Sequence, residues 1–334
     1  MSLRQLKSLS VVFGLIGLLL GTLLIGWFGA GRVATTLLRV GWGGFALVCA
    51  WQMVLFVILG SAWAAIVPER RLGLRCFIWA RMVRDAAGNC LPFSRIGGFA
   101  VGGRAIMQSG LSWAAAAASV VADMTNEFIA QTLFIGVGLI ILLSDVPNSP
   151  LAGPLAVGLA LALLAGLALL WLLRRSAGSA LFARLLNRVS VRLFRNDTDR
   201  LAALRVELAR ITRVSGRLPC ALSLHLLGWF ATGVAGWIGF HLVGARIGLL
   251  PALAIEGLLH GALTASFFVP GAIGVQEAAY VGLAAAFGVP PEAALSVSLL
   301  RRARDLALGI PILLAWQATE LRGLRKATKD LGTL

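Results

Sequence analysis

Residues 267–317 read FFVPGAIGVQEAAYVGLAAAFGVPPEAALSVSLLRRARDLALGIPILLAWQ, and this stretch decides the fold. Pro270 lacks the backbone N–H that a helical ladder needs, and the glycines after it allow the chain to turn closely. An apolar region broken in this way predicts a helical hairpin, or a pair of half-helices, over 251–288. A membrane tolerates such a break only where protein or water forms hydrogen bonds with the backbone N–H and C=O groups that the break leaves unpaired.

The region 76–108 has the same character. It contains the residues NCLPFSRIGGFAVGGRAIM, in which Pro92 is followed by the glycine pair Gly97 and Gly98. We therefore expect a second hairpin here, with helix breaks at these three residues as well as at Pro270.

Long apolar runs surround the two hairpins. Of the 334 residues, 59% are hydrophobic and only 13% are charged, and the mean hydropathy is +0.88, which is more apolar surface than a water-soluble globule could hide. Six runs exceed the ~20 residues that a helix needs to cross a bilayer. They are 9–30, 42–67, 112–143, 151–173, 219–247 and 291–318. These features predict an all-α polytopic membrane protein with about six crossing helices and two Pro/Gly-broken re-entrant hairpins, in a single transmembrane domain over 1–334.

Basic residues set the expected orientation. The net charge is +16, the segment 174–217 carries eleven arginines, and the loop 144–150 has no basic residue. Basic loops face the cytoplasm in bacterial inner membranes. Both termini are therefore expected on the cytoplasmic side of a bacterial inner membrane.

The basic segment also has helical periodicity. In LFARLLNRVSVRLF, residues 181–194, apolar side chains recur at helical spacing between arginines. This pattern predicts an amphipathic helix on the membrane surface that binds anionic lipid head groups. A helix next to lipid does not need nucleic acid to explain its charge, and no nucleic-acid partner is expected.

Shifting the chain by 178 residues aligns its two halves. The shift brings Pro92 onto Pro270 and Gly110 onto Gly288, and it superposes the order of apolar runs and breaks without a gap. We expect a first repeat unit at 41–143 and a second repeat unit at 219–321. Residues 144–218, with a connecting span and the basic loop, join the two units. The positive-inside orientation gives the two units opposite directions, so inverted repeats are expected, as in many secondary transporters.

Charged residues at lipid depth are costly and usually face a cavity or each other. In the first unit they are Arg81, Arg84, Asp85, Arg95, Arg104, Asp123 and Glu127, and in the second Glu256, His260, Glu277, Arg301, Arg302, Arg304 and Asp305. The neighbours Arg84 and Asp85, like Arg304 and Asp305, point about 100° apart on a helix, so each is expected to pair with another segment.

The breaks themselves suggest a binding site. After Pro270, a new helix N-terminus near Gly271 and Gly274 leaves free N–H groups that suit a phosphate or carboxylate. After the first break, Arg95 and Arg104 could bind a phosphate. Helix packing by small residues is the alternative explanation of the same glycines, and we favour the binding site.

No catalytic constellation, metal-ligand spacing or cofactor motif is found, so neither an enzyme nor a cofactor is expected. The cysteines lack CxxC spacing and predict no metal site. A histidine in such helices is usually a packing residue. His260 is the exception, because it shares a helix face with Glu256.

The stretches 89–107 and 267–317 resemble the lysylphosphatidylglycerol synthetase transmembrane, or flippase-like, family, most closely its hopanoid-biosynthesis-associated (HpnL-type) branch. The resemblance implies that the site residues of the first motif are Asn89, Pro92, Gly97, Gly98 and Arg104. In the second motif it implies Pro270, Gly271, Gly274, Gln276, Glu277, Arg302, Arg304 and Asp305. One departure stands out: Phe99 occupies the place where an acidic residue is expected, opposite Glu277 after the shift.

The resemblance implies movement of an amphiphilic lipid, such as a hopanoid or a phospholipid with a modified head group. The expected substrate-binding residues are Asn89, Arg95, Arg104, Glu127, Glu256, His260, Gly271, Gly274, Gln276, Glu277, Arg302, Arg304 and Asp305. Partners of three kinds stay open: the lipid itself, a second copy of the chain, and lipid-biosynthesis proteins. Two alternatives also remain, a non-transporting partner of lipid-modifying enzymes and an integral lipid-modifying enzyme.

Overall fold

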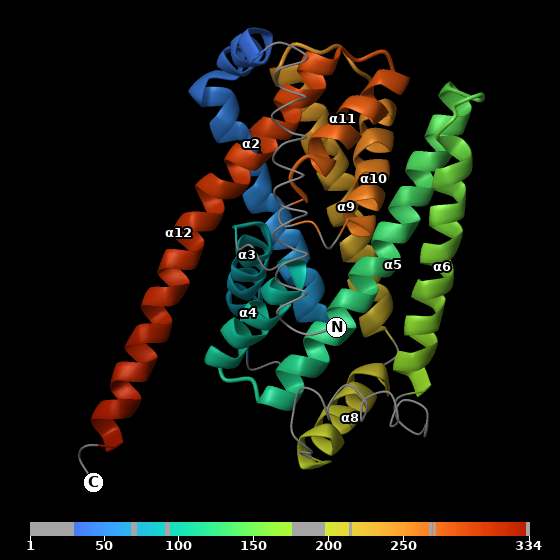
Figure 1. Ribbon diagram of the computed structural model, residues 1–334. Helices are drawn as coiled ribbons and strands as arrows, with labels where there is room; N and C mark the ends of the chain where they lie inside the picture. The colour runs from blue at the N-terminus through green and yellow to red at the C-terminus, as the bar shows by residue number, and fades with distance from the viewer. Residues whose placement is uncertain are drawn as a thin grey trace.

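The computed structural model describes residues 30–67, 72–90, 94–175, 198–213, 216–266, 269 and 272–331. Within these residues the chain is all-α, with ten helices (Figure 1). They are α2 (Ala30–Ile66), α3 (Leu74–Cys90), α4 (Ser94–Gln108), α5 (Trp113–Asp145), α6 (Ala152–Arg175), α8 (Thr198–Arg213), α9 (Arg217–Leu242), α10 (Leu249–Ala265), α11 (Val275–Ala286) and α12 (Pro291–Leu331).

Four helices are long and apolar enough to cross a membrane. They are Leu38–Ile66 in α2, Trp113–Asp145, Ala152–Leu169 in α6, and Arg217–Leu242. These confirm four of the six expected crossings. The run 9–30 lies outside the described residues. The run 291–318 does form one helix within α12, but it is not among the apolar spans, since it contains five charged side chains, four of them between Arg301 and Asp305.

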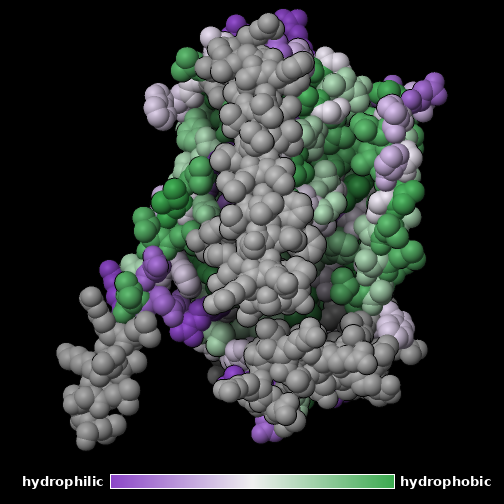
Figure 2. Space-filling view, viewed as in Figure 1, coloured by the Kyte–Doolittle hydropathy of each residue, from purple (hydrophilic) through white to green (hydrophobic). Residues whose placement is uncertain are grey.

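The outer flank of the bundle is apolar. On α6 the side chains of Val157, Leu161 and Leu164 are 63%, 62% and 64% exposed. Figure 2 shows hydrophobic residues along this side, with hydrophilic residues gathered toward the upper and lower ends. Water would penalise such a surface, whereas lipid tails do not. The protein is therefore an integral membrane protein with several apolar spans.

Besides α8, four described helices are shorter than a bilayer crossing. α3 and α10 have 17 residues each, α4 has 15 and α11 has 12, so at 1.5 Å per residue none reaches ~30 Å. In Figure 1, α3 and α4 lie in the lower half of the bundle, and α10 and α11 lie in the upper half. Both regions expected as broken therefore consist of two short helices.

The expected break at Gly97 and Gly98 is wrong. Both residues are helical within α4, and the prolines Pro92 and Pro270 lie outside the described residues. Gly98 instead allows α4 to approach α3, because a Cβ here would lie 2.6 Å from the carbonyl oxygen of Arg84. The glycine pair followed Pro92 so closely that the pattern suggested a longer break than the chain forms.

The helix bounds follow the 178-residue shift. Adding 178 to the bounds of α3, α4 and α5 gives 252–268, 272–286 and 291–323, close to α10, α11 and the first part of α12. Gly110 and Gly288, which the shift superposes, both have positive φ, at 104° and 72°. Glycine adopts this conformation easily, so each ends its short helix and turns the chain toward the next long one.

Corresponding helices run in opposite directions. In Figure 1, α2 runs downward and α9 upward, while α5 runs upward and α12 downward. A hydrogen bond from Arg217 Nη1 to the carbonyl oxygen of Val67, at 2.5 Å, joins the start of α9 to the end of α2. The two long helices are thus antiparallel neighbours.

The basic segment contributes a helix beneath the bundle. The amphipathic helix expected at 181–194 lies outside the described residues, but α8 forms further along the same segment and lies across the lower end of the bundle (Figure 1). Its apolar face buries Leu204, Leu208 and Ile211 against the ends of α2, α5 and α9. The helix forms because these residues recur at helical spacing with arginines between them.

Candidate functional site

Two groups of ionisable side chains lie inside the bundle. The first, called here the first charge cluster, joins α3, α5 and α9. Its members are Arg81, Arg84, Asp85, Asp123, Glu127 and His225. Burying charge is costly unless the groups neutralise one another. This explains why arginines of the short helix α3 face carboxylates of the long helix α5.

Two arginines hold the carboxylates of the first cluster. Arg81 donates to Asp85 at 2.9 Å and, through both terminal nitrogens, to Glu127 at 3.2 and 2.7 Å. Arg84 donates to Asp123 at 2.6 Å and also pairs with Glu127. Bidentate contacts of this kind fix geometry as well as charge. The expectation that Arg84 pairs with another helix is therefore confirmed, whereas Asp85 pairs within its own helix.

His225 closes the first cluster from α9. Its Nε2 lies 2.9 Å from a carboxylate oxygen of Asp123, and both side chains are fully buried. Its other ring nitrogen, Nδ1, is buried and has no hydrogen-bond partner among the described residues. The histidine was expected to be a packing residue, and this prediction is wrong because its ring nitrogen lies within hydrogen-bond distance of a buried carboxylate of the first cluster.

Phe99 also belongs to this region. The guanidinium carbon of Arg84 lies 4.2 Å from the centroid of the Phe99 ring, which is a cation–π contact. At the position that corresponds after the 178-residue shift, Glu277 makes an ion pair instead. These corresponding positions in α4 and α11 therefore contact an arginine by different chemistry.

The second charge cluster joins α10, α11 and α12. Its members are Glu256, His260, Glu277, Tyr280, Arg301, Arg302, Arg304 and Asp305. Arg301 donates to Glu256 at 2.8 Å and lies 3.0 Å from Nε2 of His260. The predicted proximity of His260 and Glu256 is confirmed, with 3.9 Å between Nε2 and the carboxylate.

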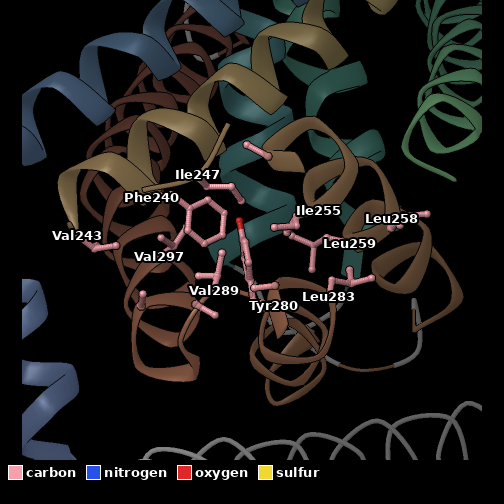
Figure 3. Close-up of a cluster of buried hydrophobic side chains, with 14 of the residues drawn as sticks. Phe240, Val243, Ile247, Ile255, Leu258, Leu259, Tyr280, Leu283, Val289 and Val297 are labelled. Carbon is pink, nitrogen blue, oxygen red and sulfur yellow. The ribbon is translucent and has the colours of Figure 1, made fainter. Parts of the chain in front are cut away.

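Tyr280 is a member that the sequence did not single out. Its hydroxyl group donates to Glu256 at 2.5 Å, and its ring stands among Phe240, Ile255 and Leu283 (Figure 3). A phenol buried in such an apolar cluster needs a polar partner for its hydroxyl group. That Tyr280 is the sole tyrosine of the chain was the one available signal.

Glu277 caps the start of α11. Its carboxylate accepts from the N–H of Gly274 at 2.7 Å and from Arg302 at 2.6 Å. Gly274 has a φ of 79°, a conformation that favours glycine. The helix N-terminus expected to bind an external anion thus holds a carboxylate of its own chain. Beside it, Gln276 donates to the hydroxyl of Ser298 at 2.9 Å.

Arg304 and Asp305 pair with each other. Arg304 donates to Asp305 at 3.0 and 2.6 Å, so the expectation that each pairs with another segment is wrong for these neighbours. The long arginine side chain can bend back along the helix surface. Arg304 also lines a cavity of about 20 Å³, together with Arg301, Glu256 and Tyr280. This volume suits a single water molecule.

The remaining expected residues lie apart from both clusters. Arg104 is 51% exposed and pairs with Glu320 in the second half of α12 at 2.6 Å. Asn89 is exposed near the end of α3. The side chain of Arg95 and the residue Gly271 lie outside the described part of the chain. Arg104 was expected at the site because it follows the glycines of the motif, but its helix turns it toward the far end of α12.

Trp229 lies between the two clusters. Its indole N–H donates to the backbone oxygen of Glu127 at 3.3 Å, and its ring lies 4.6 Å from that of His260, centroid to centroid. One side chain of α9 therefore contacts a member of each cluster. Sequence alignment of the two halves gave no sign of this contact.

Residues 14–312 match the sequence profile of the lysylphosphatidylglycerol synthase TM region. The chain belongs to this family. The match covers every residue of the first and second charge clusters, so both clusters lie within the family's membrane region. No curated protein and no solved structure matched the chain.

Proposed function

We propose that this protein moves an amphiphilic lipid between the leaflets of a bacterial inner membrane. The head group passes along the charged interior while the tails stay in lipid. A hopanoid or a phospholipid with a modified head group, as in the hopanoid-associated branch, is the proposed cargo. Both termini lie in the cytoplasm in this proposal, and the chain works as a transporter rather than an enzyme.

The architecture supports this proposal. The α3–α4 and α10–α11 pairs are each too short to cross, lie in opposite halves of the bundle and precede long helices that run in opposite directions (Figure 1). We interpret them as re-entrant hairpins of two inverted repeats. In this class of architecture, broken helices form the substrate site and the units rock around it.

The charged interior is the observation that carries the proposal. Arg301, Arg302 and Arg304 lie in the first third of α12, and the next turns of this helix carry exposed Leu306, Ile310 and Leu314. Ionisable groups at this depth are seldom kept without a function. Arginine is well suited to bind a phosphate or a hydroxyl-rich head group.

Transport requires a rearrangement of α11 against α12. The cavity of about 20 Å³ cannot hold a head group. The ion pair between Arg302 and Glu277 spans these two helices, and Arg302 is 26% exposed, so it stands at the edge of the cluster. In our proposal the pair opens, and Arg302 exchanges Glu277 for the head group of the lipid.

Reconstitution into liposomes tests the proposal. Lipids labelled in the head group, added to one leaflet, should reach the other leaflet faster with the wild-type protein than in protein-free liposomes. The charge-neutral double variant Arg302→Gln/Glu277→Gln should lower the rate roughly ten- to a hundredfold, as expected for one lost charge-assisted contact. Wild-type liposomes as slow as empty ones would contradict the proposal.

The matched control is Arg210→Gln on α8. Arg210 is also an ion-paired, part-exposed arginine, since it donates to Glu207 at 2.8 Å, but it lies outside both clusters. The rate of lipid movement with the Arg210→Gln variant should equal the rate with the wild type. A lipid-modifying enzyme that co-purifies without any lipid movement would favour the non-transporting role instead, and turnover of labelled lipid would favour an integral enzyme.

A further inference from the structure

The first charge cluster has one carboxylate too many. Among the described side chains, three carboxylates (Asp85, Asp123 and Glu127) face two guanidinium groups (Arg81 and Arg84). The group therefore carries a net charge of −1 if every carboxylate is ionised. An uncompensated charge in a medium of low dielectric constant is costly, and a bound proton or cation would remove the cost.

His225 is the member that can supply the compensation. Its Nε2 faces Asp123, and its Nδ1 is buried without a partner among the described residues. A neutral imidazole carries one proton and can accept a second one at its other ring nitrogen. No group of three or more side chains in the described part of the chain is arranged to hold a metal ion, which favours a proton over a metal.

The helices packed most closely against α9 are α2, α5, α10 and α12. α5 faces His225 with Asp123 and Glu127, and these carboxylates are held from α3 by Arg81 and Arg84, with Asp85 beside Arg81. α10 faces the adjacent Trp229 with His260. α2 carries Cys49, which lies near Arg304 and Asp305 of α12 rather than near His225. The negative charge next to the imidazole is therefore that of the first cluster.

We infer that the first charge cluster is a proton-binding site, with Nδ1 of His225 as the acceptor. A proton from the aqueous phase binds the imidazole and forms an imidazolium, and the cluster charge changes from −1 to 0. The Nε2–H bond to Asp123 is kept in both states, and release to the other side restores the neutral ring. This inference rests on the proposed function, in which the proton gradient would drive lipid movement.

Proton uptake by the purified protein in detergent tests the site without any transport. The sample is taken from pH 8 to pH 5 in weakly buffered solution with an indicator dye. His225→Gln, which retains an N–H donor toward Asp123, should take up about one proton fewer than the wild type. Asp85→Asn should also take up about one proton fewer, because the cluster is then neutral without the proton.

Glu207→Gln is the matched control for Asp85→Asn. Both carboxylates are 22% exposed and both pair with an arginine on their own helix, at 2.8 Å for Glu207 and 2.9 Å for Asp85. Ordinary carboxylates are already ionised above about pH 5, so the control should keep the wild-type uptake. The double variant His225→Gln/Asp85→Asn should lose about one proton in total, not two.

Three results would overturn the inference. They are unchanged uptake in His225→Gln, unchanged uptake in Asp85→Asn, or a loss of two protons in the double variant. In liposomes, a pH gradient should change the wild-type rate of lipid movement and leave that of His225→Gln unaffected. If lipid does not move but the proton count holds, the transport proposal fails and the proton site stands.

Discussion

The two charge clusters occupy corresponding places in the two halves, but their chemistry differs. The first sets three carboxylates against two arginines and a histidine, whereas the second sets three carboxylates against three arginines and a histidine. The 178-residue shift superposes Asp123 on Arg301, so one position carries opposite charge in the two halves. A shared architecture therefore does not impose shared chemistry, and we assign proton binding to the first half and cargo binding to the second.

Removing an arginine from the first cluster should have the largest effect on stability. Arg84→Met removes the arginine that pairs with the fully buried Asp123 and one of the two arginines that hold Glu127. Loss of one member of a buried ion pair costs about 3–5 kcal/mol. The variant should lose most of its folded, monodisperse fraction on heating, followed by size-exclusion chromatography in detergent.

Arg104→Met is the surface counterpart of this change. Arg104 is 51% exposed, and its pair with Glu320 should contribute no more than about 1 kcal/mol. Equal losses in the two variants would contradict the distinction that we draw between the buried cluster and the surface of the same hairpin.

A pair of adjacent glycines tests how tightly the first hairpin is packed. A Cβ at position 98 would lie 2.6 Å from a backbone oxygen of α3, whereas one at position 97 meets nothing within 4 Å. Gly98→Ala should therefore cost about 1–3 kcal/mol by forcing α3 and α4 apart. Gly97→Ala should be neutral or slightly stabilising, because alanine favours a helix. Thermal unfolding followed by tryptophan fluorescence compares them, and equal midpoints would argue against the close approach.

The hydroxyl of Tyr280 distinguishes the second cluster from the first. Tyr280→Phe removes the donor at 2.5 Å from Glu256 and leaves the ring packing against Phe240. The expected loss is about 1–2 kcal/mol, since Arg301 still holds the carboxylate. The unfolding midpoint in detergent measures it. Phe240→Leu, which changes only the apolar neighbour, separates a packing effect from loss of the hydrogen bond.

Replacing one carboxylate by an amide should have the smallest effect on stability, with opposite sign in the two clusters. Asp85→Asn removes the excess charge of the first cluster and should leave stability unchanged or raise it by up to about 1 kcal/mol. Glu277→Gln weakens both the pair with Arg302 and the cap at Gly274, and should lower stability by about 1 kcal/mol. Unfolding midpoints that fall equally in both variants would remove the contrast in charge balance.

Much of the fold could be predicted because a helix that crosses the bilayer needs a long apolar run, which is visible in the sequence. Four apolar runs became spans, both interrupted regions became pairs of short helices, and Gly110 and Gly288 took the same kind of turn. The limits were local. Gly97 and Gly98 looked like a break, but a glycine pair also fits a helix that packs closely on its neighbour.

The sequence by itself determined which charged residues enter the membrane, since an ionisable residue within an apolar run is carried into the bilayer with the helix that the run forms. It did not determine their partners. Asp123 and His225 are 102 residues apart, and Tyr280 and Glu256 come from different helices, so their hydrogen bonds depend on how the helices rotate and pack against one another. Only the tertiary structure brings these groups within hydrogen-bond distance, because pairing across helices minimises the cost of buried charge in a way that spacing along one chain cannot show.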